Sequence, residues 1–388
     1  MPLDAPVAPR HRSDIQGLRA VAVILVILCH ANVRGFRGGF LGVDVFFVIS
    51  GFVITKLLHR APPRQVLRNL GSFYVRRVRR IVPAATVVLC ATVLVAWWVL
   101  GPALDPALFT DVRWASLFAG NYRMAATGID YFVAGVFPSL VTHFWSLGVE
   151  EQFYAVFPLA VFSLTWLTPR RGRAALLGVV TLLAVVASAW WSWHLTPHHH
   201  VDAYYLPFTR FWELGLGSLT ALVPTTWAGV NTKWRSVVSV GAAAALAAAV
   251  AFVTNGAQVP GVITWWPCGA TALLLWTGDG SSGVVVRVLR WRPLALLGDV
   301  SYSLYLWHYL WVMLPLQMAN PPQGWWVTPA EILGALACAI ASYVLIENPI
   351  RRSTRLDRDP WSVVLVLAIC VALTWNVAWM VSRAAHLA

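Results

Sequence analysis

The sequence predicts an all-α, polytopic integral membrane protein with about eleven transmembrane helices. Of its 388 residues, 59% are hydrophobic and only 12% are charged, whereas soluble globular domains contain about 25% charged residues. The 22 tryptophans suit a protein with many membrane–water interfaces, where this side chain concentrates. A third observation is the distribution of Lys and Arg, which alternates from loop to loop along the chain.

Eleven stretches are apolar over the roughly 20 residues that a helix needs to cross the hydrocarbon core. The first, 16–34, follows a polar and basic N-terminus without a convincing cleavage site, so we predict a retained span. The stretch 111–126 is amphipathic and is predicted to lie at the interface or to re-enter the membrane. The other predicted spans are 39–58, 81–100, 141–167, 174–194, 206–224, 236–254, 260–277, 294–317, 329–346 and 361–382.

The loops between these spans assign the two sides of the membrane. If the N-terminus is cytoplasmic, loops such as TPRRGRAA and ENPIRRSTRLDRD fall inside and hold most of the Lys and Arg. Outside loops such as TPHHHVDAYYLP and MANPPQGWW hold none. This positive-inside pattern predicts a cytoplasmic N-terminus and an external C-terminus. It also accounts for the net charge of +13 without a nucleic-acid partner.

No metal or disulfide chemistry is predicted. The five cysteines lie in apolar stretches without CxxC or zinc-site spacing, so we predict buried free thiols. No HxxxH, HExxH or ExxH pattern occurs within the predicted spans. The run from His198 to His200 lies in an outside loop, where a solvated turn is expected.

Six ionisable residues stand out at similar depth within predicted spans, although a charged side chain at the bilayer centre costs several kcal/mol. A satisfied structural role is open for any single one of them. As a set they predict a polar cavity inside the helix bundle. They are His30, Asp44, Glu150, Glu151, Glu213 and His308.

Helical spacing places polar residues on shared faces. Arg19 and His30 are eleven residues apart, which is close to three turns and about 16 Å along one helix. Histidine is the usual side chain for proton transfer near neutral pH, and a nearby buried carboxylate can orient its ring. Two further stripes are His143–Glu150–Tyr154 in the span 141–167 and Ser301–Tyr305–His308 in the span 294–317.

A basic cluster precedes the third predicted span, in the segment SFYVRRVRRIVP. Anchoring to anionic lipid is one explanation. The other is a clamp in which guanidiniums on consecutive turns grip a polyphosphate at the cytoplasmic surface. No Walker or GxGxxG motif accompanies the cluster, so a nucleotide triphosphatase is not expected. Its members are Arg76, Arg77, Arg79 and Arg80.

Six segments, in order, resemble the signatures of the membrane-bound acyltransferase 3 family, which includes O-antigen and peptidoglycan O-acetylases. Single motifs of this kind are weak, but six in order across nearly the whole chain are specific. The resemblance implies a single transmembrane domain over 1–388, with its core at 14–352 and an extra span at 361–382. The segments are DIQGLRAVAVILVILCHA, GGFLGVDVFFVISGFVIT, FYVRRVRRIVPA, HFWSLGVEEQFYAVFP, GDVSYSLYLWH and IENPIRR.

The resemblance implies transfer of an acyl group, most often acetyl, from acyl-CoA to a hydroxyl of an envelope glycan or glycolipid in the bacterial inner membrane. It implies that His30 is the essential catalytic residue and that Arg19 and the basic cluster are functional. We expect the cluster to bind acyl-CoA, and we expect Arg19 either to bind donor phosphate or to screen and position the cavity. The phosphates of CoA would meet the cluster from the cytosol, and the pantetheine arm would extend toward His30. The expected partners are membrane lipid, acyl-CoA and the acceptor, without a metal.

Our mechanistic hypothesis is direct transfer, in which His30 takes the proton of the acceptor hydroxyl and the alkoxide attacks the thioester. Glu150 orients His30 or the acceptor, and an acyl-histidine intermediate is the less favoured variant. The remaining candidates for cavity or acceptor contacts are Asp44, His143, Trp145, Glu151, Tyr154, Glu213, Tyr305 and His308.

Many family members with an eleventh span continue into an external SGNH-type domain, whereas this sequence stops shortly after its last predicted span. A separate or missing domain that hands on the acyl group is therefore one expectation. Two rival functions stay open, namely O-acylation of a small metabolite such as a macrolide and transport of a lipid-linked sugar. Transport is disfavoured because no inverted repeats are evident.

Overall fold

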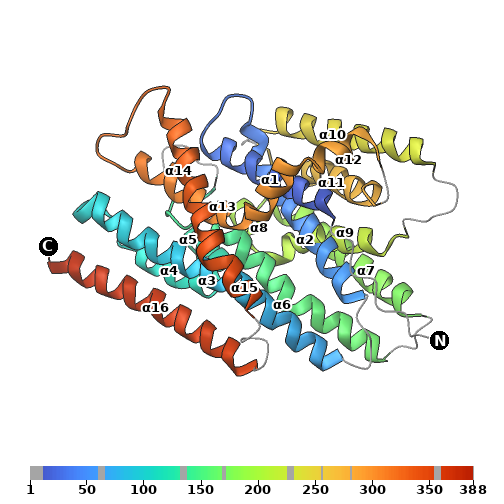
Figure 1. Ribbon diagram of the computed structural model, residues 1–388, viewed down its shortest axis with the longest axis horizontal. Helices are drawn as coiled ribbons and strands as arrows, with labels where there is room; N and C mark the ends of the chain where they lie inside the picture. The colour runs from blue at the N-terminus through green and yellow to red at the C-terminus, as the bar shows by residue number, and fades with distance from the viewer. Residues whose placement is uncertain are drawn as a thin grey trace.

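The computed structural model describes residues 12–59, 66–131, 138–167, 172–224, 231–254, 257–279, 282–353 and 360–387. Over these residues the chain is helical and contains no strand (Figure 1). The long helices are α1 (Ser13–His30), α2 (Gly42–His59), α3 (Val66–Leu100), α6 (Phe144–Leu167), α7 (Arg173–Leu195), α10 (Thr232–Phe252), α13 (Arg292–Leu316), α14 (Val327–Ser342) and α16 (Pro360–Leu387). The shorter helices are α4 (Ala107–Ser116), α5 (Gly120–Thr127), α8 (His200–Tyr205), α9 (Phe211–Leu222), α11 (Trp265–Thr277), α12 (Val284–Leu289) and α15 (Asn348–Arg352).

Within the described residues, 7 helical segments are long and apolar enough to cross a membrane. They contain α1, α2, α3, α7, α10, α14 and α16. The prediction of an all-α, multi-pass membrane protein is thereby confirmed. The count of eleven spans and the sides of the two termini stay predictions.

Two predicted spans are shorter as helices than their apolar stretches. In place of 206–224, α9 has 12 residues, which is about 18 Å at 1.5 Å per residue. In place of 260–277, α11 has 13 residues. Pro207 begins a separate 3₁₀ turn before α9, because proline lacks the N–H that would continue a helix through it. Most residues of both helices are buried, so protein rather than lipid covers much of their surface.

Two other segments differ from their predicted bounds. The third predicted span began at residue 81, but α3 starts at Val66 and runs for 35 residues. The basic cluster is therefore part of the same helix as the apolar half that follows it. The amphipathic stretch 111–126 forms parts of two short helices, α4 and α5, which are separated by residues 117–119.

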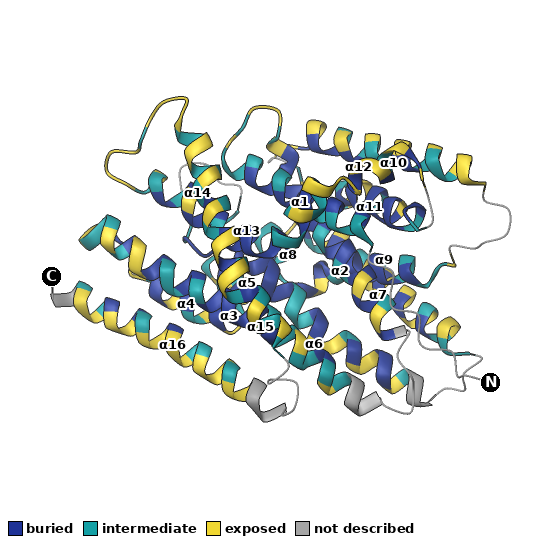
Figure 2. Ribbon diagram, viewed as in Figure 1, coloured by how far each residue is buried: buried dark blue, intermediate teal, exposed yellow. Residues whose placement is uncertain are grey.

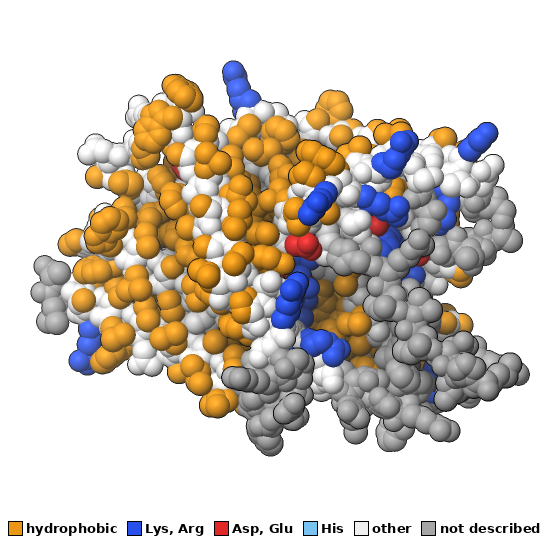
Figure 3. All heavy atoms as spheres, viewed as in Figure 1, with side chains coloured by type: hydrophobic (Ala, Val, Ile, Leu, Met, Phe, Trp, Pro, Cys, Tyr) orange, Lys and Arg blue, Asp and Glu red, His pale blue; other side chains and the backbone are white. Residues whose placement is uncertain are grey.

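The helices that carry the candidate site lie at the centre of the bundle. α1 packs against α13 and α2, and α2 packs against α9. α16 lies along α3 and α4 at one edge, and α10 lies at the opposite edge (Figure 1). Buried residues concentrate in the central helices, whereas much of α16 and α10 is exposed (Figure 2). Figure 3 shows a broad hydrophobic band on one face with most Lys and Arg to one side of it, as expected for a surface that contacts lipid.

Glycines allow α2 and α9 to cross at backbone contact. A β-carbon at Gly51 of α2 would lie 1.7 Å from the carbonyl oxygen of Leu214 in α9. In the reciprocal contact, a β-carbon at Gly217 would lie 1.9 Å from the carbonyl oxygen of Val48. Small residues at helix interfaces let membrane helices approach this closely. The crossing fixes α2, which carries several residues of the candidate site.

Arg79 joins the basic half of α3 to the end of α15. Its guanidinium is buried, with an exposed fraction of 2%. Nε and Nη2 donate to the carbonyl oxygen of Ile350 at 3.1 and 2.9 Å, and Nη2 also donates to the carbonyls of Arg351 and Ser353. These carbonyls belong to the last turn of a helix, where a cation is favoured and the intrahelical donors have run out.

We expect Gly51→Ala to lower the melting temperature of the purified protein, because the added methyl group has no space at the α2–α9 crossing. Overpacking of this kind costs about 1–3 kcal/mol of stability. Gly241→Ala in α10 is the matched control, because nothing lies within 4 Å of its β-carbon position. Equal melting temperatures for Gly51→Ala and the wild type would contradict the close crossing.

Arg79→Ala is expected to destabilise the fold by about 2–3 kcal/mol, because it leaves helix-terminal carbonyls without their charged donor. Arg76→Ala is the control from the same cluster, because Arg76 is exposed. Thermal unfolding of both variants in the same detergent checks the difference. If the two variants melt alike, Arg79 does not hold α15.

Candidate functional site

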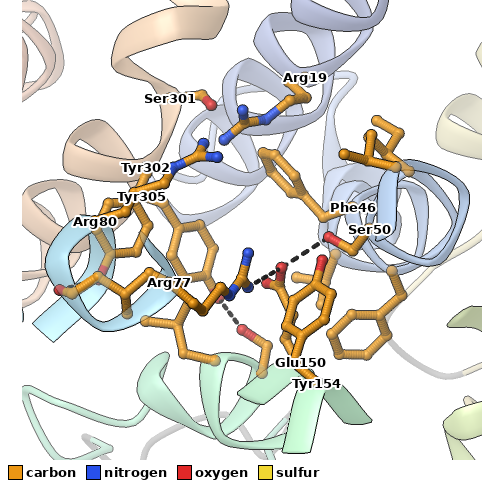
Figure 4. A pocket seen from close by; sticks show the side chains of 17 residues that line it. Arg19, Phe46, Ser50, Arg77, Arg80, Glu150, Tyr154, Ser301, Tyr302 and Tyr305 are labelled. Atoms are coloured by element: carbon orange, nitrogen blue, oxygen red, sulfur yellow. Dashed lines mark hydrogen bonds and ion pairs between the residues drawn. The ribbon is translucent and has the colours of Figure 1, made fainter. Parts of the chain in front are cut away.

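A pocket opens between α1, α2, α3, α6 and α13 and contains about 760 Å³ of empty space, its open mouth included (Figure 4). Helical spacing explains its polar lining, because residues three or four apart on a helix share a face. Arg77 and Arg80 are paired in this way on α3, and Glu150 and Tyr154 are paired on α6. Arg19 of α1 and Ser50 of α2 complete the polar part of the wall.

Arg77 is the arginine of the pocket that the protein itself neutralises. Its Nη2 donates to Glu150 Oε1 at 2.9 Å and to Glu151 Oε1 at 2.7 Å. The guanidinium also lies 3.6 Å from the ring centroid of Tyr154. Ser50 Oγ donates to Glu150 Oε1 at 2.8 Å, so this carboxylate is fully engaged at the pocket wall (Figure 4).

Arg19 and Arg80 differ from Arg77 in having no ion pair among the described residues. Their guanidiniums point toward one another across the pocket (Figure 4). The one side-chain bond of Arg19 in the described part runs to Gln16 Oε1 at 3.3 Å. Ser301 Oγ, which faces the same pocket, is buried without a hydrogen-bond partner there. Two adjacent guanidiniums and a free hydroxyl suit an anion with several oxygens.

The four arginines of the predicted clamp point in different directions around α3. Because α3 is continuous, successive side chains turn by about 100° around its axis. Arg77 and Arg80 therefore face the pocket, whereas Arg79 points to the end of α15 and Arg76 is exposed. The structure brings two of the four predicted donor-binding residues of the cluster to the pocket.

A second cluster surrounds His30, which is the last residue of α1. His30 Nδ1 lies 2.9 Å from His308 Nε2, and His30 Nε2 lies 2.5 Å from the hydroxyl of Tyr131. His308 Nδ1 lies 2.7 Å from the carbonyl oxygen of Tyr305 in the preceding turn of α13. The contact between α1 and α13 thus joins two histidines that are 278 residues apart in the chain.

When both rings are neutral, these contacts determine their tautomers. A carbonyl oxygen only accepts, so His308 must carry its proton on Nδ1, and its Nε2 accepts from His30. His30 therefore carries its proton on Nδ1, which leaves a lone pair on Nε2. That lone pair accepts the hydroxyl proton of Tyr131. His308 is thus the group that orients His30, a role that the sequence analysis had offered to Glu150.

His143 lies beside this pair without bonding to it. Its ring stacks on Tyr309 at a centroid distance of 4.6 Å and meets His308 edge-on at 5.6 Å. Nε2 lies 3.2 Å from the carbonyl oxygen of Leu306 and must donate to it. Nδ1 is buried and has no partner in the described part of the chain.

Aromatic rings hold the Tyr131 side of the cluster. The rings of Tyr131 and Tyr204 stack at 5.0 Å, and Trp145 packs on Tyr204 at 4.7 Å. The guanidinium of Arg210 lies 4.7 Å from the ring centroid of Tyr204 and 5.3 Å from that of Trp145. Trp145, a predicted cavity residue, therefore belongs to the wall behind Tyr131.

Asp44 and Glu213, two further predicted residues, bind Arg210 and do not line the pocket. Arg210 Nη1 donates to Asp44 Oδ1 and Glu213 Oε1 at 3.0 Å each. All three side chains are buried, and the cluster connects α2 to α9 beneath the aromatic wall. The geometry favours a structural role for both carboxylates.

Asp44, Glu213 and Cys268 form the one set of metal-ligating side chains in the described residues whose donor atoms lie within 4.8 Å of one another. Arg210 already supplies positive charge 3.0 Å from both carboxylates. A second cation at this position would be repelled by the guanidinium. The donor set therefore does not fit a metal ion.

Sequence reasoning identified the central residues of the site but missed several residues that contact them. Arg210 could have been found, because it is a charged residue inside the predicted span 206–224. Tyr131 gave no signal, because an aromatic residue in a predicted outer loop is ordinary at a membrane interface. Ser50 likewise looked like one small residue among many in an apolar span.

The family model described as an acyltransferase domain matches residues 12–347. OatA of Staphylococcus aureus, an O-acetyltransferase by name, is 31% identical over 358 residues. YrhL of Bacillus subtilis, provisionally named a peptidoglycan O-acetyltransferase, is 32% identical over 363 residues. BcsY of Komagataeibacter xylinus, provisionally named a membrane-bound transacylase, is 32% identical over 388 residues. No solved structure shows a significant match.

The matches cover most of this chain but not all of each relative. They include 90% of this chain and 59% of OatA, and 88% of this chain and 55% of YrhL. With BcsY the match covers 95% of this chain and 91% of the relative. The family model and these relatives agree with the six sequence signatures. The chain therefore belongs to the acyltransferase 3 family of membrane acyltransferases.

Proposed function

We propose that the protein is an O-acyltransferase of a bacterial cytoplasmic membrane that moves an acyl group, most often acetyl, from cytosolic acyl-CoA to a hydroxyl of an envelope glycan on the external side. One observation carries this proposal. α1 holds an arginine, Arg19, that has no ion pair in the described part of the chain. It lies about 16 Å along the helix from His30, whose Nε2 is a hydrogen-bond acceptor. An anion site and a proton acceptor on one helix suit a donor with phosphates at one end and a thioester at the other.

The charges in the pocket support the proposal that the phosphates of the donor bind there. Arg77 is neutralised by Glu150 and Glu151, so its charge is not available to a ligand. Arg19 and Arg80 are available, and the phosphates of CoA offer the oxygens that guanidiniums bind. The pantetheine arm would then extend past the aromatic side chains of the pocket toward the histidine pair. The names of OatA and YrhL support an envelope glycan as the acceptor.

The histidine pair supports the proposal that His30 transfers the proton in the reaction. An acceptor hydroxyl in the position of the Tyr131 hydroxyl would donate to His30 Nε2. His30 takes the proton while the acceptor oxygen bonds to the thioester carbonyl carbon. The carbon–sulfur bond then breaks, and the CoA thiolate takes the proton back from His30 to leave as the thiol. His308 keeps the ring of His30 in the required tautomer through both steps.

Tyr131 supports a two-step variant with the same base. A hydroxyl bonded to a histidine that a third group orients is the usual arrangement of an activated nucleophile. Tyr131 Oη would take the acyl group from the thioester while CoA leaves as the thiol. The acceptor hydroxyl would then take the acyl group from Tyr131. His30 moves one proton in each step, so the two routes share His30 and differ in Tyr131.

We expect His30→Ala to lower acyl-CoA turnover by about 10²–10⁴-fold, because it removes the general base. The measurement is release of CoA thiol from acetyl-CoA by purified protein in nanodiscs, with an envelope glycan as acceptor. His194→Ala is the control, because His194 is an exposed histidine on α7. Wild-type turnover in a folded His30→Ala variant would overturn the assignment of the base.

Tyr131→Phe is expected to lower turnover in either route, and the size of the loss separates them. Direct transfer predicts a loss of less than about tenfold, because only one contact to His30 is removed. The two-step route predicts a loss of about 10²–10⁴-fold, because the nucleophile is removed. Mass spectrometry of wild-type protein mixed with acetyl-CoA alone gives the second readout. An acetyl group on Tyr131 supports two steps, and unmodified protein supports direct transfer.

A further inference from the structure

The donor pocket and the histidine pair are separate spaces in this structure. Neither the partly buried His30 nor the buried His143 and His308 are among the residues that line the pocket. The pocket includes Ser146 of α6 and Tyr305 of α13 in its wall. A thioester held by Arg19 and Arg80 would therefore meet a wall before it met His30.

Tyr305 is the central residue of that wall. Its hydroxyl lies 2.7 Å from Ser146 Oγ and donates to the carbonyl oxygen of His143 at 3.1 Å. The ring of Phe46 from α2 packs edge-on against the ring of Tyr305 at 6.2 Å. Tyr305 and Ser146 are 6% and 5% exposed, so both side chains are buried. One hydrogen-bonded pair and one ring contact thus connect three helices across the end of the pocket.

The backbone carbonyl of Tyr305 contacts the histidine pair. Its carbonyl oxygen accepts the Nδ1 proton of His308, which in turn accepts from His30. The side chain of Tyr305 therefore faces the donor pocket while its carbonyl holds the histidine pair. Because the carbonyl belongs to the main chain, a change of the side chain leaves the atom that orients His308 in place.

We propose that Tyr305 is a specificity-determining partition, which admits the acyl group to His30 when its ring leaves Ser146 and which restricts transfer to short acyl chains. The inference rests on the proposed acyl-CoA-dependent transfer. The space that the ring vacates is the space that the acyl group occupies, so the size of this side chain limits the length of the chain that fits. While closed, the partition excludes water from the thioester and prevents an open path between the two sides of the membrane.

Two kinds of variant distinguish the effect of the ring's volume from the effect of its hydrogen bond. Tyr305→Ala removes the ring and enlarges the space next to His308. Tyr305→Phe and Ser146→Ala keep the ring and remove the bond between the two hydroxyls from either side. Tyr74→Phe is the matched control, because it also removes a tyrosine hydroxyl that donates to a backbone carbonyl, that of Ala155 at 2.8 Å, but Tyr74 does not line the pocket.

The experiment compares acetyl-CoA with butyryl-CoA and hexanoyl-CoA, using purified full-length variants in nanodiscs and release of CoA thiol as the readout. Tyr305→Ala is expected to raise the ratio of kcat/KM for butyryl-CoA over acetyl-CoA at least about tenfold, which is the scale at which pockets discriminate single methylenes. Tyr305→Phe and Ser146→Ala are expected to raise acyl-CoA hydrolysis in the absence of acceptor, to similar extents. The double variant is expected to show no further increase, because both changes remove the same hydrogen bond. Tyr74→Phe is expected to leave both the chain-length ratio and this hydrolysis unchanged.

The outcomes distinguish the partition from the proposed function. If the wild type does not consume acyl-CoA, the transfer reaction itself is wrong. If the wild type turns over but the chain-length ratio is the same in Tyr305→Ala, the partition does not set specificity. Should Tyr305→Ala fail to fold, hydrolysis by Tyr305→Phe and Ser146→Ala decides, and wild-type rates in both variants would overturn the proposal.

Discussion

A charge inside a membrane protein must be compensated by the protein, because lipid offers it no partner, and this constraint organises the interior of the bundle. Arg77 joins α3 to α6 through two carboxylates, and Arg210 joins α2 to α9 through two others. Arg79 joins α3 to the end of α15 through backbone carbonyls. Each of these cations therefore also works as a cross-link between helices, and removing one leaves its partners unsatisfied in a dry environment.

Arg19 and Arg80 are exceptions to this rule, because they face one another without a carboxylate partner in the described part of the chain. Two guanidiniums side by side repel each other unless an anion lies between them. This repulsion is the reason for proposing that the donor's phosphates bind there. The histidine pair differs, because each of its rings has hydrogen-bond partners within the protein. Its arrangement leaves His30 Nε2 as the acceptor on which the proposed reaction depends.

The proposed reaction accounts for the separation of these two clusters. In it, a donor from one side of the membrane and an acceptor from the other meet without opening a path for water. Tyr305 suits both requirements, since its side chain lies in the wall of the pocket and its carbonyl oxygen accepts from His308. On the other side of the histidine pair, the rings of Tyr131, Tyr204 and Trp145 pack together against Arg210.

The sequence by itself determined the class of fold, the family and the spacing of Arg19 and His30, because apolar length, loop charge and helical period are local properties. It did not determine which arginines of the basic cluster face the pocket, since that depends on α3 continuing as one helix before residue 81. It did not identify His308 as the partner of His30, because residues 278 apart are joined only when α1 packs against α13. Which residues contact one another depends on how the helices pack, and this packing depends on the whole chain.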